Sequence, residues 1–105
     1  MIWSDNEILH EERDFAVSIN YCYTHPSVPV PFMHLDVTNW SPSALRAMCS
    51  VWSRLRPSLP PVLFAQATID DARISKLAKY FGFQFHGDCP CDDGTMRRLF
   101  VNYRK

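Results

Sequence analysis

The sequence lacks any hydrophobic run approaching the ~20 residues that a membrane-spanning helix needs. It also lacks an export signal, because its first residues, MIWSDNEILHEER, contain no basic segment followed by an apolar one. Its 105 residues contain no Walker loop, dinucleotide fingerprint or Ser/His/Asp pattern. These absences argue against the enzyme classes that such motifs define, and they predict a cytoplasmic protein without a membrane segment.

The chain has no net charge, with 11 basic and 11 acidic residues, but the charges are unevenly spread. Residues 1–40 carry six acids and one base, whereas residues 41–105 carry five acids and ten bases, so the two parts bear charges of −5 and +5. The asymmetry indicates either a basic surface for an anionic ligand such as a coenzyme phosphate, or two parts that attract each other in the fold, which we favour. So few bases argue against nucleic-acid binding.

Apolar residues are abundant enough for one folded domain covering residues 1–105. Hydrophobic residues make up 47% of the chain and charged residues only 21%. A chain of this length and composition builds a single core and leaves little room for a second domain. The four cysteines are expected to be reduced thiols, because no export signal accompanies them.

Cysteines and histidines in two predicted loops provide an alternative chemistry. The spacings are Cys-x2-His and His-x2-Cys-x-Cys, and the residues are Cys22, His25, His86, Cys89 and Cys91. Zinc accepts such nitrogen and sulfur ligands if the two loops meet. Neither half is the tight Cys-x2-Cys knuckle, and Pro26 and Pro90 constrain the loops, so we favour ordinary reduced thiols.

The first part of the chain is predicted to be β-structure. Residues 1–4 suit a short strand, and the apolar members of residues 15–23 fall on alternate positions, as in a half-buried strand. Alternating prolines in residues 24–31 predict a loop, because proline cannot donate to a ladder. Alternation resumes in residues 32–37, which predicts a further strand.

A helix is predicted to begin at once after this strand. Ser41 suits the N-cap and Pro42 the first helical position. Apolar residues then recur every three or four positions until the helix ends near Pro57. Residues 62–67 form a short β-prone apolar run of the kind that lies inside a sheet.

The last third predicts a second helix and a hairpin. Asp70 and Asp71 suit a helix start, and Gly82 suits a helix end. Residues 83–86 and 96–103 are β-prone on either side of a polar turn. The order is therefore β-β-α-β-α-β-β, which predicts an α/β fold: a mixed sheet with two main helices and at least one right-handed crossover.

This order, and above all residues 67–83, resembles the GNAT superfamily of N-acetyltransferases. The segment reads ATIDDARISKLAKYFGF, and its closing Leu-x4-Gly-Phe matches the end of a family helix. Residues 32–104 follow the family's core order, and residues 1–31 correspond to a shortened N-terminal part. The resemblance implies a short, divergent GNAT-like domain.

The resemblance also implies acetyl-coenzyme A as cofactor and an amine as acyl acceptor. The coenzyme would lie at the strand end and helix start, on Val37, Thr38, Ser41, Ser43 and Ala44. The family often has a catalytic carboxylate on the strand that precedes this helix. His34 and Asp36 share one face of that strand, and either could take a proton from an amine through water.

Two positions depart from the family pattern. Residues 38–44 contain no glycine, whereas the family's phosphate loop has a basic residue and spaced glycines. Ala78 stands where many members have a tyrosine that protonates the leaving thiolate. Tyr80 cannot replace that tyrosine, because a helix turns about 100° per residue and Tyr80 points well away from Ala78.

The shortened N-terminal part leaves no room for the helical pair that usually shapes the acceptor site. An acceptor pocket would then need another chain, as in a homodimer. The alternative is a non-catalytic GNAT-fold interaction protein. Small proteins of this kind resemble those that bacteriophages encode, as virion components or as inhibitors of a host protein.

Overall fold

The computed structural model describes residues 2–25, 27–91 and 93–104, and strands account for about half of them. The strands are β1 (Ile2–Trp3), β2 (Glu7–Glu11), β3 (Phe15–His25), β4 (Val28–Val37), β5 (Val62–Thr68), β6 (Gln84–Pro90) and β7 (Met96–Tyr103). The helices are α1 (Pro42–Leu55) and α2 (Ala72–Tyr80), and a 3-10 turn at Arg56–Ser58 follows α1.

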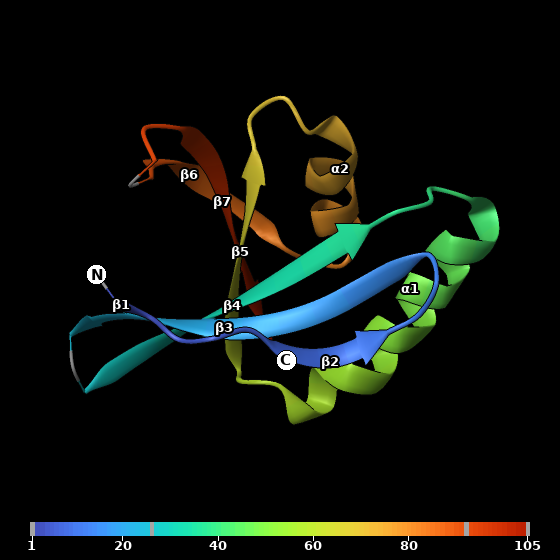
Figure 1. Cartoon of the computed structure of the whole chain (residues 1–105), viewed down its shortest axis with the longest axis horizontal. Helices are drawn as coiled ribbons and strands as arrows, with labels where there is room; N and C mark the ends of the chain where they lie inside the picture. The colour runs from blue at the N-terminus through green and yellow to red at the C-terminus, as the bar shows by residue number, and fades with distance from the viewer. Residues whose placement is uncertain (1, 26, 92, 105) are drawn as a thin grey trace.

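All seven strands form one sheet (Figure 1), in the order β1-β3-β4-β5-β7-β6, with β2 also paired to β3. β4 and β5 are parallel, whereas the other neighbours are antiparallel. This mixed sheet with two main helices is the α/β fold that the order of elements predicted.

The predicted loop over residues 24–31 is wrong, because β4 begins at Val28 and includes two prolines. Pro29 lies opposite Tyr23 in β3, and Pro31 lies opposite Tyr21. Because both prolines occupy positions of the same parity, their nitrogens point to the same side of the strand. Proline is tolerated in a strand where the missing N–H would point away from the neighbouring strand.

The N-terminal residues contribute more β-structure than the sequence predicted. The short strand expected in residues 1–4 is present as β1, but β2 was missed. β2 pairs with β3 around a register shift between Ile8 and His10, and it is largely exposed. Pairing with β3, rather than local alternation, therefore decides this strand.

Both helices pack on the same face of the sheet. The buried cluster includes Met48 and Val51 from α1, Leu77 from α2, and Phe15 and Leu63 from strands. Among the described residues, the opposite face has no helix over it. No helix within the described ranges is long and apolar enough to cross a membrane.

The end of α1 is tied to the end of α2 through one buried amide. Arg56 Nε donates to Asn102 Oδ1 at 2.6 Å, and Asn102 Nδ2 donates to the Phe81 carbonyl at 3.2 Å. Between Phe81 and Phe83, Gly82 has φ +87°, and a Cβ there would lie 3.3 Å from Asn102 Nδ2. Glycine suits this turn because it adopts a positive φ without strain.

Candidate functional site

The sheet opens between β4 and β5. Only one residue pair, Phe32 and Phe64, joins these two parallel strands. Past that pair, residues 33–37 of β4 and 65–68 of β5 face each other without a ladder between them. Since each strand already uses its other edge, on β3 or β7, the facing backbone groups stay free for a ligand.

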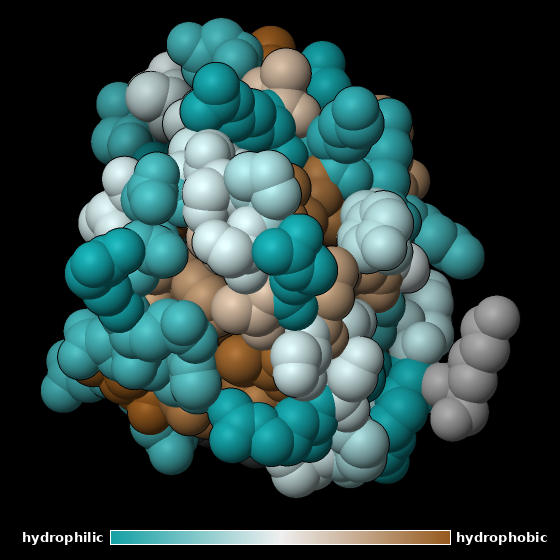
Figure 2. Space-filling view, turned by 90° about the vertical axis from the view of Figure 1, so that its right-hand side faces the viewer, coloured by the Kyte–Doolittle hydropathy of each residue, from teal (hydrophilic) through white to brown (hydrophobic). Residues whose placement is uncertain are grey.

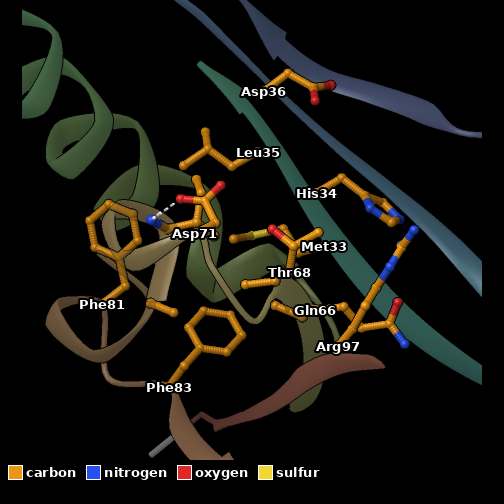
Figure 3. Close-up of a pocket in the computed structure, with 14 residues that line it drawn as sticks. Met33, His34, Leu35, Asp36, Gln66, Thr68, Asp71, Phe81, Phe83 and Arg97 are labelled. Carbon is orange, nitrogen blue, oxygen red and sulfur yellow. Dashed lines mark hydrogen bonds between the residues drawn. The ribbon is translucent and has the colours of Figure 1, made fainter. Parts of the chain in front are cut away.

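A groove of about 280 Å³ occupies this opening, and we call it the β4–β5 groove. Figure 3 draws the 14 residues that line it. They are Met33, His34, Leu35, Asp36, Ala65, Gln66, Ala67, Thr68, Asp71, Ile74, Ala78, Phe81, Phe83 and Arg97. Consecutive residues of both strands line it, so it is a gap between strand edges and not a hollow on one face. The space-filling view of the side facing right in Figure 1 shows hydrophobic side chains between hydrophilic ones (Figure 2).

Both predicted catalytic residues line the groove. His34 is half-buried, and its Nε2 lies 2.6 Å from Asn20 Oδ1, a contact in which the ring nitrogen donates. Burial lowers the pKa of His34, Arg97 lowers it further, and Asp36 opposes both. A neutral imidazole at pH 7 then keeps Nδ1 as a proton acceptor. Figure 3 shows Arg97 reaching toward His34, whereas Asp36 lies farther along the strand.

Arg97 also lines the groove, although the sequence did not assign it to the site. It comes from β7 and reaches the groove across β5, where Thr68 is its partner in the ladder. Local pattern showed only a basic residue on a predicted strand. Its functional position depends on pairing between strands that are far apart in the sequence.

The predicted cofactor residues at the start of α1 lie outside the groove lining. Ser41 caps the helix, because its Oγ accepts from the Ala44 amide at 3.1 Å and lies 3.2 Å from Ser43 Oγ. Pro42 has no N–H, so the Ser43 amide is the one left in this turn for an anion. Ala44 is only 2% exposed and cannot offer its side chain to a ligand.

The two residues before this turn serve the fold. Val37 packs against the core cluster, and Thr38 Oγ1 donates to the Arg13 carbonyl at 3.0 Å. A cation nearby comes from α2, where the Arg73 guanidinium lies over the Trp40 ring, 5.7 Å from its centroid. Arg73 is therefore a second candidate that the sequence prediction missed.

The tyrosine expected from the family pattern has no substitute on α2. Ala78, which stands where many family members have a tyrosine, lines the groove. Tyr80 is 75% exposed and is absent from the groove lining. No α2 hydroxyl therefore points into the groove as a proton donor.

The residues considered as an alternative zinc site do not form a metal site within the described residues. Cys22, Cys89 and Cys91 all line a second cavity, but no group of three or more metal-binding side chains occurs among the residues described. His86 is exposed on β6, and the His25 side chain lies outside the described residues.

No protein-family model and no curated protein matches the sequence. Solved structures do match. A GNAT-family acetyltransferase from Streptococcus agalactiae superposes with a TM-score of 0.64 at 10% identity, over 88% of this chain and 60% of that one. A Bordetella pertussis protein described as a GNAT-family acetyltransferase superposes with a TM-score of 0.64 at 18% identity, over 85% of this chain and 57% of that one. A probable GNAT-family acetyltransferase from Chromobacterium violaceum superposes with a TM-score of 0.54 at 16% identity, over 88% of this chain and 60% of that one.

These comparisons show that the chain has the GNAT fold, as predicted. It spans about 60% of the length of the matching proteins. The protein is therefore GNAT-like in architecture, and its activity has to be argued from its own groove.

Proposed function

We propose that the protein binds acetyl-coenzyme A in the β4–β5 groove and transfers the acetyl group to an amine. The unpaired, facing edges of residues 33–37 and 65–68 carry this proposal. The pantetheine arm of the coenzyme contains two amides, and an extended chain with amides pairs with a free strand edge. The GNAT fold of the chain supports the same ligand.

The cofactor's phosphates fit the start of α1 less well than its arm fits the groove. One free amide, at Ser43, replaces the several amides of a glycine-rich loop. The helix dipole and Arg73 add positive potential there. We therefore place the phosphates near Ser43 and Arg73 and expect weak binding.

Acetyl-coenzyme A would supply an activated acetyl thioester. His34 accepts the amine proton at Nδ1, directly or through one water, and Asp36 stabilises the resulting imidazolium. The Arg97 guanidinium on the groove wall favours negative charge at the reacting carbonyl oxygen. No α2 side chain protonates the leaving thiolate, so solvent has this role.

Calorimetric titration with acetyl-coenzyme A tests the proposal. Ser43→Glu places a negative charge beside the phosphates while suiting a helix start, so affinity should fall about tenfold. Ser50→Glu, exposed on the same helix, is the control and should bind like wild type. No binding to wild type at millimolar coenzyme would end the enzyme proposal. Equal binding by all three proteins would show that the phosphates do not bind at Ser43.

Arg73→Gln tests whether the Arg73 guanidinium contributes to binding of the coenzyme phosphates. We expect its affinity for acetyl-coenzyme A to fall about threefold to tenfold, because Arg73 is exposed and partly screened. Lys79→Gln, on the same helix and also exposed, is the matched control. An equal loss in both variants would reflect net charge alone.

The second candidate function is a non-catalytic interaction protein. The same free strand edges accept an extended peptide as well as a coenzyme arm. In this proposal the protein is a bacteriophage virion component or an inhibitor of a host protein in the cytoplasm, whereas a homodimer would complete the acceptor pocket of the enzyme. Absence of coenzyme binding, together with the mass in solution from light scattering, separates these alternatives.

A further inference from the structure

A second cavity lies on the sheet face that carries no helix among the described residues. Its volume is about 490 Å³, larger than that of the groove. We call it the hairpin pocket, because the β6–β7 hairpin forms one wall. Its lining consists of Trp3, Cys22, Val30, Phe32, Phe64, Gln66, Cys89, Pro90, Cys91, Asp93, Arg97 and Leu99.

Three aromatic rings from three strands line this pocket. The centroids of Trp3 and Phe32 lie 5.1 Å apart, and those of Phe32 and Phe64 lie 5.6 Å apart. Phe32 is only 8% exposed, whereas Trp3 is 39% exposed. Such a wall favours a flat apolar group over a polar one.

The pocket's cation has an unused donor. Arg97 donates through Nη2 to Asp93 Oδ2 at 3.2 Å. Its Nε is buried and has no hydrogen-bond partner among the residues that the structure describes. A buried donor without an acceptor is unfavourable. An oxygen atom of a ligand would remove this cost.

The pocket's carboxylate is already engaged by the protein. Asp93 Oδ1 accepts from the Thr95 hydroxyl at 2.6 Å and from the Thr95 amide at 3.0 Å, while Oδ2 accepts from Arg97. These bonds, with the Arg97 charge, lower the pKa of Asp93. A ligand amine would therefore compete with Thr95 and Arg97 for the Asp93 carboxylate. A ligand oxygen could instead accept a hydrogen bond from the unpartnered Arg97 Nε.

The remaining polar side chains are neutral. Gln66 Nε2 lies 3.7 Å from Cys89 Sγ and donates to it. Burial, with the neighbouring Cys91, raises the pKa of the Cys89 thiol, so this thiol stays protonated. The free charged donor of the pocket is therefore on Arg97.

We propose that the hairpin pocket binds a small aromatic carboxylate, with its carboxylate on Arg97 and its ring against Trp3, Phe32 and Phe64. The volume lies within the range of small-molecule sites, which is about 300–1,000 Å³. Guanidinium and carboxylate form strong, charge-assisted hydrogen bonds. Arg97 lines both the hairpin pocket and the β4–β5 groove, but binding of the carboxylate needs no coenzyme and is measured without it.

Titration of the ¹⁵N-labelled protein with 3-phenylpropanoate, followed by NMR, tests the proposal. We expect saturable shifts at the Trp3 indole and Arg97 Nε signals. Two matched probes, 3-phenylpropanamide and 3-phenylpropylamine, keep the ring and chain but change the charge. The amine should bind at least about tenfold more weakly than the carboxylate.

Arg97→Gln should weaken carboxylate binding at least about tenfold. Arg98→Gln is the control, because Arg98 is the next residue of β7 and lines neither cavity. If Arg97→Gln fails to fold, the preference of wild type for carboxylate over amine still decides the question. Any one of three results would overturn the proposal. They are equal binding of the charged probes, no saturable binding at 10 mM (about the weakest measurable affinity), and unchanged affinity in a folded Arg97→Gln variant.

Discussion

The hydrogen bond between Arg56 and Asn102 should couple the end of α1 to the turn that precedes β6. Asn102→Leu keeps the size of the side chain but removes two hydrogen bonds, one from Arg56 Nε and one to the Phe81 carbonyl. At about 1–2 kcal/mol each, their loss should lower the free energy of unfolding by about 2–4 kcal/mol. Asn102 is 6% exposed, so water cannot readily replace these partners.

A double-mutant cycle with Arg56→Met isolates the direct contact. Arg56 retains carbonyl partners at Pro60 and Pro61 in the Asn102→Leu variant, and part of its side chain stays in solvent. We therefore expect a coupling of about 1–2 kcal/mol between the two substitutions. Urea denaturation of wild type, both single variants and the double variant measures it. A coupling below about 0.5 kcal/mol would refute the idea that this contact holds the two elements together.

Three further predictions, tested by four substitutions, concern the structure, and urea denaturation measures each of them. Gly82→Ala should cost about 1–3 kcal/mol through its positive φ and the contact with Asn102 Nδ2, whereas Gly94→Ala, with positive φ but no nearby atom, should cost less. Ser41→Ala removes the α1 cap and should cost about 0.5–2 kcal/mol, and no loss would mean that the cap is replaced by water. The lowered pKa of His34 means that the unfolded chain binds its proton more readily, so stability should fall as the pH drops below 6.5. His34→Gln should flatten this dependence between pH 7 and 5, and equal slopes in both proteins would contradict it.

Much of the fold could be predicted because local signals agreed with it. Ser41 and Pro42 mark the start of α1 at the observed residue, and Gly82 marks the turn after α2. The strand with Pro29 and Pro31 was missed, since a proline's effect depends on which side its neighbouring strand lies. β6 likewise continues to Pro90, beyond the predicted end at residue 86, through pairing with β7.

Two side chains of the groove lining were named from the sequence. His34 and Asp36 were placed correctly on one strand face, because side chains alternate along a strand. Arg97 and Arg73 were missed as site residues, because each reaches the site from an element distant in the sequence.

The sequence by itself determined the types and order of the elements apart from β2, and with them the GNAT-like fold, because caps, alternation and helical spacing act over a few residues. Only the tertiary structure decided that β4 and β5 part after a single residue pair. That separation makes the groove, and it brings Arg97 toward His34 across β5. Such distances depend on how whole strands pair and diverge, which local periodicity does not encode.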